Sequence, residues 1–307
     1  MKETPTKLSA AARNGLISAF GCYALWGLLP VYWKWLSHVS YFELVGHRIL
    51  WCFVFLFILA RFVQKADLKQ YLKDPRSLGI LAGCSAMITA TWCLYIFGVT
   101  SGRIVEVALG YYVTPLTIIL CSVLFFKETL TLVQKIATGL ATIGVIYLAV
   151  DYGSFPWLAL ALAVLFGIYS SLKKLGGYPV VAGLTIESML ALPLALAFII
   201  VSFFLPNREF LAPSGGTTTL LLVLGGVVTA IPFLLFAKAA NTAPLSLIGF
   251  IQYVEPTITL ALGVVLYGEP FTSSHLVCFS LIWLGLILVT VEVLWSLRAR
   301  NARNSAG

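Results

Sequence analysis

The sequence predicts an all-α integral membrane protein with ten transmembrane helices in two inverted five-helix repeats. Of its 307 residues, 60% are hydrophobic and only 10% are charged, a balance that excludes a soluble two-domain protein. The apolar residues form long, closely spaced runs, each near the about 20 residues that cross a bilayer as a helix. A tetrapeptide pattern, Tyr-Val-x-Pro, also occurs twice within these runs. Together these observations indicate a duplicated, polytopic membrane protein.

Each apolar run is expected to be a helix. In the hydrocarbon core every backbone donor and acceptor must find a partner within the protein, and these runs lack the alternation of polar and apolar residues that barrel strands show. The predicted spans cover residues 14–36, 42–64, 77–99, 103–126, 132–151, 154–172, 179–205, 217–240, 243–267 and 272–297.

The two copies of the pattern are Tyr112–Pro115 and Tyr253–Pro256, and their offset is 141 residues. Glu128 and Gly144 follow the first copy at the spacing at which Glu269 and Gly285 follow the second. The repeats are therefore assigned to 14–151 and 154–297, with short tails at 1–13 and 298–307. Because each repeat has five spans, an odd number, the second copy enters the membrane in the opposite orientation.

The duplicated residues have structural interpretations. Pro115 and Pro256 lie within spans, where a proline removes a backbone hydrogen bond and kinks a helix. Glu128 and Glu269 lie just after their spans, where a carboxylate is expected to favour the N-terminus of the following helix.

The net charge of +8 reflects topology, and no nucleic-acid partner is expected. With loops assigned alternately to the two sides, sixteen of the 20 Lys and Arg residues fall on one side. This asymmetry predicts that both termini are cytoplasmic in a bacterial inner membrane. The sixteen are Lys2, Lys7, Arg13, Arg61, Lys65, Lys69, Lys73, Arg76, Lys127, Lys135, Lys173, Lys174, Lys238, Arg298, Arg300 and Arg303; Lys34, Arg103 and Arg208 lie on the other side, and Arg48 lies within a span.

Polar groups inside a bilayer are costly, so they mark candidate functional sites. His47 and Arg48 lie in the second span, and Gln252 lies in the ninth; we predict that all three contact a substrate. Glu255, near the middle of the ninth span, and Glu187, in the seventh, are the candidate proton-coupling residues. The sequence leaves open an alternative in which Arg48 pairs with Glu255 or Glu187 and only holds helices together.

Aromatic residues are dense in the spans. Trp26, Trp92, Tyr112 and Tyr253 lie deep enough to line a substrate cavity, with helix packing as the alternative. Trp33 and Trp35 lie near a span end, where tryptophans commonly form an interfacial belt.

Several other functions are disfavoured. The six cysteines fall within spans without metal-ligand spacing, so neither a metal nor a cofactor is expected. The chain has no nucleotide-binding P-loop, no Gly-x-Ser-x-Gly and no His-Glu-x-x-His. A membrane-embedded enzyme is thus disfavoured, and a non-transporting scaffold or receptor is the main alternative to a transporter. The expected partners are a small-molecule substrate and membrane lipid, and a homodimer is left open.

Three strings carry a family resemblance: Trp26-Gly-Leu-Leu-Pro30, Glu43-x-x-x-His47-Arg48-x-x-Trp51 and Gly249-Phe-x-Gln252-Tyr253-x-x-Pro256-Thr257. From about residue 12 to 296 the chain resembles the RarD branch of the EamA, or drug/metabolite transporter, superfamily. That superfamily moves amino acids, sugars, nucleotide conjugates and drugs, and this branch is associated with chloramphenicol sensitivity. The resemblance implies ten helices in two inverted repeats, with spans 1–4 and 6–9 around the substrate cavity and spans 5 and 10 at the periphery.

These features together predict a secondary transporter that exports a small amphipathic metabolite or drug by alternating access. Without a nucleotide site, transport is either coupled to protons or facilitative.

Overall fold

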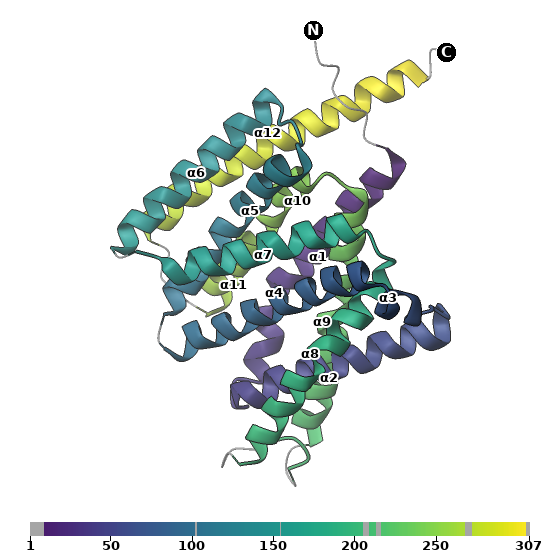
Figure 1. Cartoon of the computed structure of the whole chain (residues 1–307). Helices are drawn as coiled ribbons and strands as arrows, with labels where there is room; N and C mark the ends of the chain where they lie inside the picture. Colours follow the sequence, from purple (N-terminus) through teal and green to yellow (C-terminus); the bar gives the residue numbers. More distant parts are fainter. Residues whose placement is uncertain are drawn as a thin grey trace.

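The computed structural model describes residues 9–101, 103–153, 155–204, 209–212, 216–267 and 272–304. Within these ranges ten spans are long and apolar enough to cross a membrane, which confirms the predicted fold class (Figure 1). They are α1 (Ala10–Trp35), α2 (Tyr41–Ile58) with a π-helical end η1 (Leu59–Val63), α4 (Pro75–Thr100), α5 (Ile104–Phe126), α6 (Leu132–Tyr152), α7 (Trp157–Gly176), α8 (Val180–Phe203), α9 (Gly216–Thr242), α10 (Leu245–Gln252) followed by α11 (Val254–Tyr267), and α12 (Ser273–Asn304). A short helix, α3 (Lys69–Lys73), lies in the basic loop and was not predicted.

Local capping residues explain many helix ends. The side chains of Ser9, Ser40 and Thr131 accept hydrogen bonds from the first turns of α1, α2 and α6. Gly153 and Gly177 end α6 and α7 with φ values of 77° and 56°, a left-handed conformation that glycine adopts without a steric cost. Gly153 thus allows the sharp turn between the two repeats.

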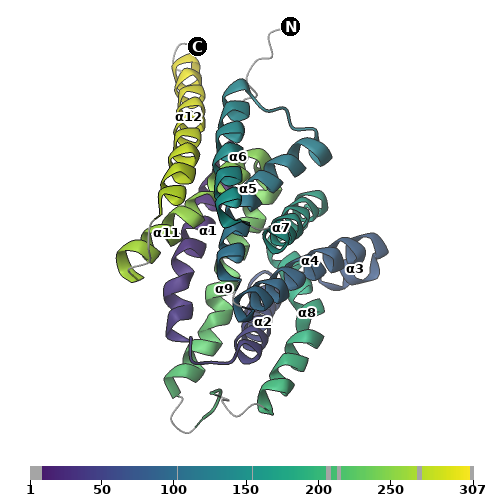
Figure 2. The ribbon, with the colours of Figure 1, turned by 90° about the vertical axis from the view of Figure 1, so that its left-hand side faces the viewer.

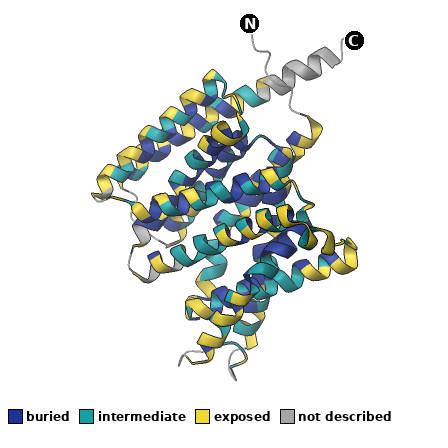
Figure 3. Ribbon diagram, in the orientation of Figure 1, coloured by how far each residue is buried: buried dark blue, intermediate teal, exposed yellow. Residues whose placement is uncertain are grey.

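Most helix packing runs between the two repeats rather than within one. Helix α1 packs on α9 and α11, α2 on α8 and α9, α4 on α7 and α8, and α5 on α7 and α10. The remaining helices, α6 and α12, run side by side along one edge of the molecule, and their outer faces are exposed (Figures 1–3). The two repeats therefore share one core, with α6 and α12 outside it as the family resemblance implies.

The duplicated glycines mark the symmetry of this packing. Gly144 on α6 lies against the backbone of Cys278 on α12, and Gly285 on α12 lies against the backbone of Ala137 on α6. A Cβ atom at Gly144 would be 3.0 Å from the Cys278 carbonyl oxygen, and one at Gly285 would be 3.1 Å from that of Ala137. Ala137 and Cys278 are themselves equivalent in the repeat, so the same close contact forms twice. Small residues allow membrane helices to approach in this way.

The two duplicated prolines have different outcomes. Helix α5 continues through Pro115, whereas the ninth span is divided into α10 and α11 at Tyr253, shortly before Pro256. The Tyr253 amide donates to the Phe250 carbonyl in a tighter turn at this break. The proline thus lies beside a helix break in the second repeat but not in the first, so the missing amide alone does not decide where a helix ends.

Loop contacts show which loops share an end of the bundle. At the end that holds most Lys and Arg residues, here called the basic end, Lys174 binds Glu128 at 2.6 Å, and the Asn241 amide donates to the Tyr178 carbonyl at 2.8 Å. At the opposite end His38 contacts Thr218 at 3.2 Å. This grouping of loops agrees with the alternation predicted from the sequence.

Glu128 caps a helix other than the one predicted. Its carboxylate accepts hydrogen bonds from the amides of Leu245 and Ser246, both at 2.9 Å, at the start of α10 in the second repeat. The following helix, α6, is capped by Thr131 instead. The sequence prediction assumed a local partner and was therefore wrong about the helix. Its repeat equivalent, Glu269, lies outside the described residues.

The contacts of Glu128 also control its ionisation. Burial alone would raise the pKa of this carboxyl, but hydrogen bonds from Lys174, Ser246 and Leu245 more than offset burial and hold the pKa below its ordinary value. A carboxyl whose pKa is lowered by folding stabilises the folded state above its unfolded-state pKa, and this contribution is lost as the pH falls through the folded-state pKa.

The first testable prediction follows from this ionisation. Glu128→Gln should lower the melting temperature of the detergent-solubilised protein at pH 7, and the difference from wild type should shrink as the pH falls below about 4. The control is Asp151→Asn, which removes a charge at the exposed end of α6. If Glu128→Gln lowers the melting temperature by the same amount at pH 7 and at a pH below about 4, Glu128 does not act as an ionised cap.

The second prediction concerns the crossing of α2 and α9. A Cβ atom at Gly226 would lie 2.3 Å from the Trp51 carbonyl carbon and 2.5 Å from the Cys52 nitrogen, so the helices would have to separate. Gly226→Ala should therefore reduce stability by about 1–3 kcal/mol, seen as a lower melting temperature. Gly139→Ala on α6 is the matched control, because a Cβ there meets nothing within 4 Å. Equal melting of the two variants would show that the crossing is not tight.

Candidate functional site

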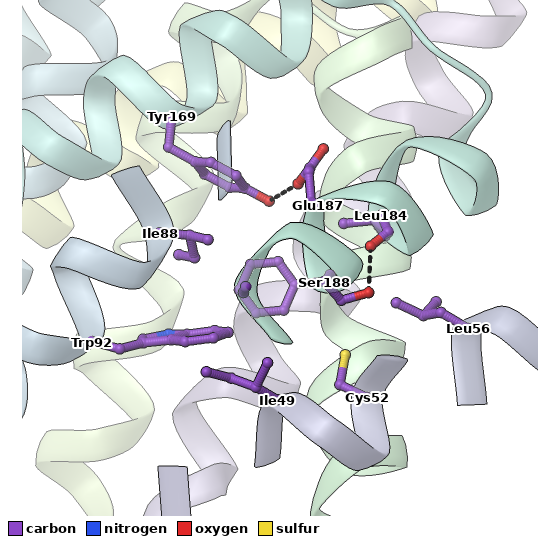
Figure 4. Close-up of a pocket in the computed structure, with 11 residues that line it drawn as sticks. Ile49, Cys52, Leu56, Ile88, Trp92, Tyr169, Leu184, Glu187 and Ser188 are labelled. Carbon is purple, nitrogen blue, oxygen red and sulfur yellow. Dashed lines mark hydrogen bonds between the residues drawn. The ribbon is translucent and has the colours of Figure 1, made fainter. Parts of the chain in front are cut away.

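An apolar pocket lies between the two repeats (Figure 4). It receives side chains from α2 and α4 of the first repeat and from α7, α8 and α9 of the second, and its cavity volume is about 30 Å³. Small-molecule sites are usually concave and mostly apolar with a few polar groups. This pocket has that composition, and in the present conformation it has room for about one water molecule. The lining residues are Ile49, Cys52, Leu56, Ile88, Trp92, Tyr169, Leu184, Glu187, Ser188, Ala191 and Phe233.

Glu187 supplies the ionisable group of this pocket, and it is paired. Lys173 from α7 binds its Oε1 atom at 2.7 Å, and the Tyr169 hydroxyl donates to its Oε2 atom at 3.4 Å (Figure 4). Both Glu187 and Lys173 are buried, so each compensates the other's charge where solvent cannot. The sequence treated Lys173 only as a basic loop residue, because nothing in its local pattern indicates a partner one helix away.

Of the two predicted site tryptophans, Trp92 lines the pocket and Trp26 lies beside it. Trp26 is packed edge-on against Phe233 and Phe166, with ring centroids 5.2 and 5.8 Å apart, and Phe233 also contacts Trp92 at 6.0 Å. Phe233 thus joins the two tryptophans in one aromatic cluster. This cluster draws rings from both repeats, which sequence spacing alone does not reveal.

Arg48 lies one helical turn before the pocket residue Cys52 on α2. Its guanidinium carbon is 4.7 Å from the Trp92 ring centroid and 5.1 Å from that of Trp33, and its Nε donates to the Thr229 hydroxyl at 3.0 Å. Trp33, which the sequence assigned to the interfacial belt, is therefore a neighbour of Arg48. Cation–π contacts of this kind favour a desolvated guanidinium.

Arg48 pairs with neither of the acids that the sequence left open. In the described ranges the ion pairs are Arg103–Glu106, Lys173–Glu187 and Lys174–Glu128. Glu187 takes its cation from α7, and Glu255 has neither an ion pair nor a hydrogen bond within those ranges. The described part of the structure therefore contains no ion pair between Arg48 and either of these two acids. The alternative in which such a pair only holds helices together does not apply.

His47 points away from Arg48. Its Nδ1 atom accepts a hydrogen bond from the Trp51 indole at 3.2 Å, and its ring lies over Phe210 with centroids 4.0 Å apart. Glu43 binds the same segment, because its carboxylate accepts from the Glu209 and Phe210 amides at 2.6–3.2 Å. Glu43 and His47 therefore position the segment at residues 209–212, and neither is among the pocket residues.

Tyr112 and Tyr253, which are equivalent in the repeat, face the peripheral helices rather than the pocket. Tyr112 packs edge-on against Phe279 of α12 with centroids 5.2 Å apart, and Tyr253 packs among residues of α6 and α12. The neighbouring Tyr111 lies near Arg48 instead. The sequence prediction selected the duplicated tyrosine and missed Tyr111.

Gln252 and Glu255 lie near the break in the ninth span. Gln252 is buried, and its side-chain oxygen has no hydrogen-bond partner within the described part of the chain. Glu255 is half-buried, and its main chain contacts α1, where a Cβ at Gly27 would lie 3.0 Å from the Glu255 carbonyl oxygen. Neither residue lines the pocket. The described residues also contain no cluster of His, Cys, Asp or Glu that could hold a metal ion.

Comparison with known proteins agrees with this architecture. The model of the EamA-like transporter family matches the chain twice, over residues 13–150 and 155–291. A crystal structure of a protein that is 20% identical superposes with a TM-score of 0.69, covering 92% of this chain and 98% of the other, and so shares its fold.

Curated relatives match over nearly their whole length. The uncharacterized transporter YojE of Bacillus subtilis is 39% identical over 95% of this chain and 99% of its own. Protein RarD of Streptomyces exfoliatus is 35% identical, covering 96% of this chain and 93% of its own, and protein RarD of Escherichia coli is 31% identical, covering 93% and 97%. The chain therefore belongs to the RarD branch of the EamA-like transporter family, and it is a multi-pass membrane transporter rather than an enzyme.

Proposed function

We propose that this transporter exports a small amphipathic metabolite or drug across the bacterial inner membrane by alternating access of the two repeats. The observation that carries the proposal is the position of the pocket, which is lined by α2 and α4 of one repeat and by α7, α8 and α9 of the other. A site at the interface of inverted repeats is exposed to alternate sides when one repeat rocks against the other.

Cross-repeat contacts at the two ends of the bundle support such a movement. At the basic end Glu128 of the first repeat binds Lys174 and the start of α10 in the second. At the opposite end Glu43 of the first repeat binds the amides of Glu209 and Phe210 in the second. Each set consists of a few polar contacts in a loop region, so one set can break while the other holds.

The lining of the pocket favours an amphipathic substrate. Trp92 and Phe233 offer aromatic surfaces, while Ser188 and Glu187 place polar groups on the α8 side, where the Ser188 hydroxyl donates to the Leu184 carbonyl and Glu187 accepts from Tyr169 (Figure 4). A scaffold or receptor has no need for a polar group within an apolar pocket at the centre of its bundle. Transport of a molecule with apolar and polar parts accounts for both.

We further propose that transport is coupled to protons through Glu255. Glu43 binds amides of the segment at 209–212, and Glu106 and Glu187 each bind a donor on α7, whereas Glu255 has no such donor within the described residues. It lies directly before Pro256, next to the break between α10 and α11. A half-buried carboxyl without a fixed partner can gain and lose a proton without breaking a structural contact. Glu187, which is held by Lys173, is the second candidate.

The proposed orientation predicts which loops react from the cytoplasm. In a cysteine-free background, a cysteine at Gln70 in the basic loop should react with a membrane-impermeant maleimide only from the cytoplasmic side. A cysteine at Ser37, in the exposed loop after α1, should react only from the periplasmic side, because the excess of Lys and Arg remains inside. Labelling of Ser37→Cys from the cytoplasm would reverse the topology.

Proton coupling predicts a specific effect of Glu255→Gln, which mimics the protonated carboxyl. In proteoliposomes that contain a labelled substrate, the variant should still exchange substrate across the membrane but should lose accumulation driven by a pH gradient. Glu292→Gln is the matched control, because within the described chain its carboxylate accepts a hydrogen bond only from the Thr131 hydroxyl, near the edge helices. A Glu255→Gln variant that still accumulates substrate with unchanged pH dependence would exclude Glu255 as the carrier.

A further inference from the structure

The guanidinium of Arg48 is a cation inside the bundle that has no counter-ion among the described residues. An unpaired charge among membrane helices is costly, and such charges are normally balanced by an acid or by a bound ligand. The other cations within the cross-repeat region, Lys173 and Lys174, each bind a glutamate at 2.7 and 2.6 Å. Arg48 binds no carboxylate within the described ranges, and its only hydrogen bond there is that of Nε to Thr229.

The contacts of Arg48 fix the guanidinium but leave its terminal nitrogens available. Trp33 and Trp92 cover it with their ring faces, and Thr229 holds Nε. A guanidinium has five N–H donors, so the four on the terminal nitrogens have no acceptor in the described part of the protein. These donors are arranged as a fork that fits the two oxygens of a carboxylate. Two rings and one hydroxyl thus orient the guanidinium and leave its fork of terminal N–H donors available to an anion.

The space beside Arg48 is accessible. Tyr95 and Tyr111 lie near the guanidinium, and 39% and 40% of their surfaces are exposed. The guanidinium is therefore not sealed off by these neighbouring rings. Arg48 itself is only half-buried, so it borders the same space.

This space adjoins the pocket between the repeats. Trp92 lines the pocket and also contacts Arg48, and Cys52, one turn further along α2, lines the pocket as well. A molecule whose apolar part lies against Trp92 and Phe233 would therefore have Arg48 within reach of its polar end. The paired Glu187 lies on the α8 side of the same pocket.

We propose that Arg48 is an anion-binding residue and that the substrates of this transporter carry a carboxylate next to an aromatic or other apolar group. The carboxylate binds the terminal nitrogens of Arg48 and supplies the counter-charge that none of the described residues provides. The inference rests on the proposed transport function, because it assigns a substrate class to the same pocket. It differs from a structural role for Arg48, which would require an acid of the protein as partner.

The test compares two probes of nearly equal shape, 3-phenylpropionate and its neutral amide, 3-phenylpropanamide. Binding to the purified protein is measured by isothermal titration calorimetry at pH 7.5 in phosphatidylcholine nanodiscs, so that no anionic lipid competes. Wild type should bind the carboxylate about tenfold or more tightly than the amide, as expected for charge-assisted hydrogen bonds in a partly desolvated site. Equal affinities, or no measurable binding of the carboxylate, would overturn the proposal.

Variants of Arg48 test whether this residue causes the preference for the carboxylate probe. Arg48→Gln should abolish the preference, so that both probes bind with the affinity that the amide has for wild type. Arg48→Lys should keep part of the preference, because an ammonium retains the charge but not the fork. Arg61→Gln is the matched control, since the Arg61 guanidinium also lies over an aromatic ring, that of Phe62 at 5.9 Å, but outside this site. An Arg48→Gln protein that still prefers the carboxylate would place the anion site elsewhere. If Arg48→Gln does not fold, Arg48→Lys provides the test. A preference for the carboxylate probe as large as that of wild type in Arg48→Lys would contradict the role of the guanidinium fork.

Flux of both labelled probes in proteoliposomes separates this inference from the proposed function. A carboxylate preference in binding without movement of either probe would support the anion site and contradict transport. Movement of both probes at equal rates with equal affinities would support transport and overturn the anion site.

Discussion

The structure depends on the packing of each repeat against the other. Helices α1, α2, α4 and α5 bury their inner faces mainly on α7 to α11, and α6 finds its main partner in α12. In a membrane such packing relies on close contact and on internal hydrogen bonds rather than on the hydrophobic effect. Glycines at the helix crossings allow the close contact. Carboxylates that bind backbone amides of the other repeat supply the hydrogen bonds.

Three glutamates of the first repeat show how polar groups serve this arrangement. Glu43, Glu106 and Glu128 accept hydrogen bonds from backbone amides of the second repeat, at residues 209–210, 158 and 245–246. Each carboxylate satisfies amides at the start of a helix or in a loop, where no helical partner exists. Charges at the ends of the bundle therefore join the repeats, while Arg48 and Glu255, deeper inside, have no such partner in the described chain. This division separates structural charges from those available for transport.

The fold could be predicted from the sequence because its signals are local. Span length, apolar composition and the offset between the two Tyr-Val-x-Pro copies follow directly from the order of residues. The bounds of the spans differ from the predicted ones by at most four positions, except that α12 ends at Asn304, seven residues beyond the predicted end. The site could be predicted only in part. Arg48 and Trp92 were identified because a charge or a deep tryptophan within a span is rare, and the structure brings them into contact.

The other site residues depend on which side of a helix faces the interior. The duplicated tyrosines, Tyr112 and Tyr253, contact the edge helices, whereas Tyr111, only one residue before Tyr112 on α5, lies near Arg48. Lys173, Trp33 and Glu43 acquire their roles from partners on distant segments, at 187, 48 and 209–210. No pattern within a single span records such a partner, and the symmetry of the repeat favoured the tyrosines that it duplicates.

The capping of α10 by Glu128 has a consequence for biosynthesis. The chain is made from its N-terminus, so Glu128 and the whole first repeat enter the membrane before residues 245–246 exist. During that interval the carboxylate lacks its amide partners, and α6 lacks α12, which is synthesised last. The first five helices must therefore wait in the bilayer as a loosely associated set. Their final packing is completed only when the end of the chain has left the ribosome.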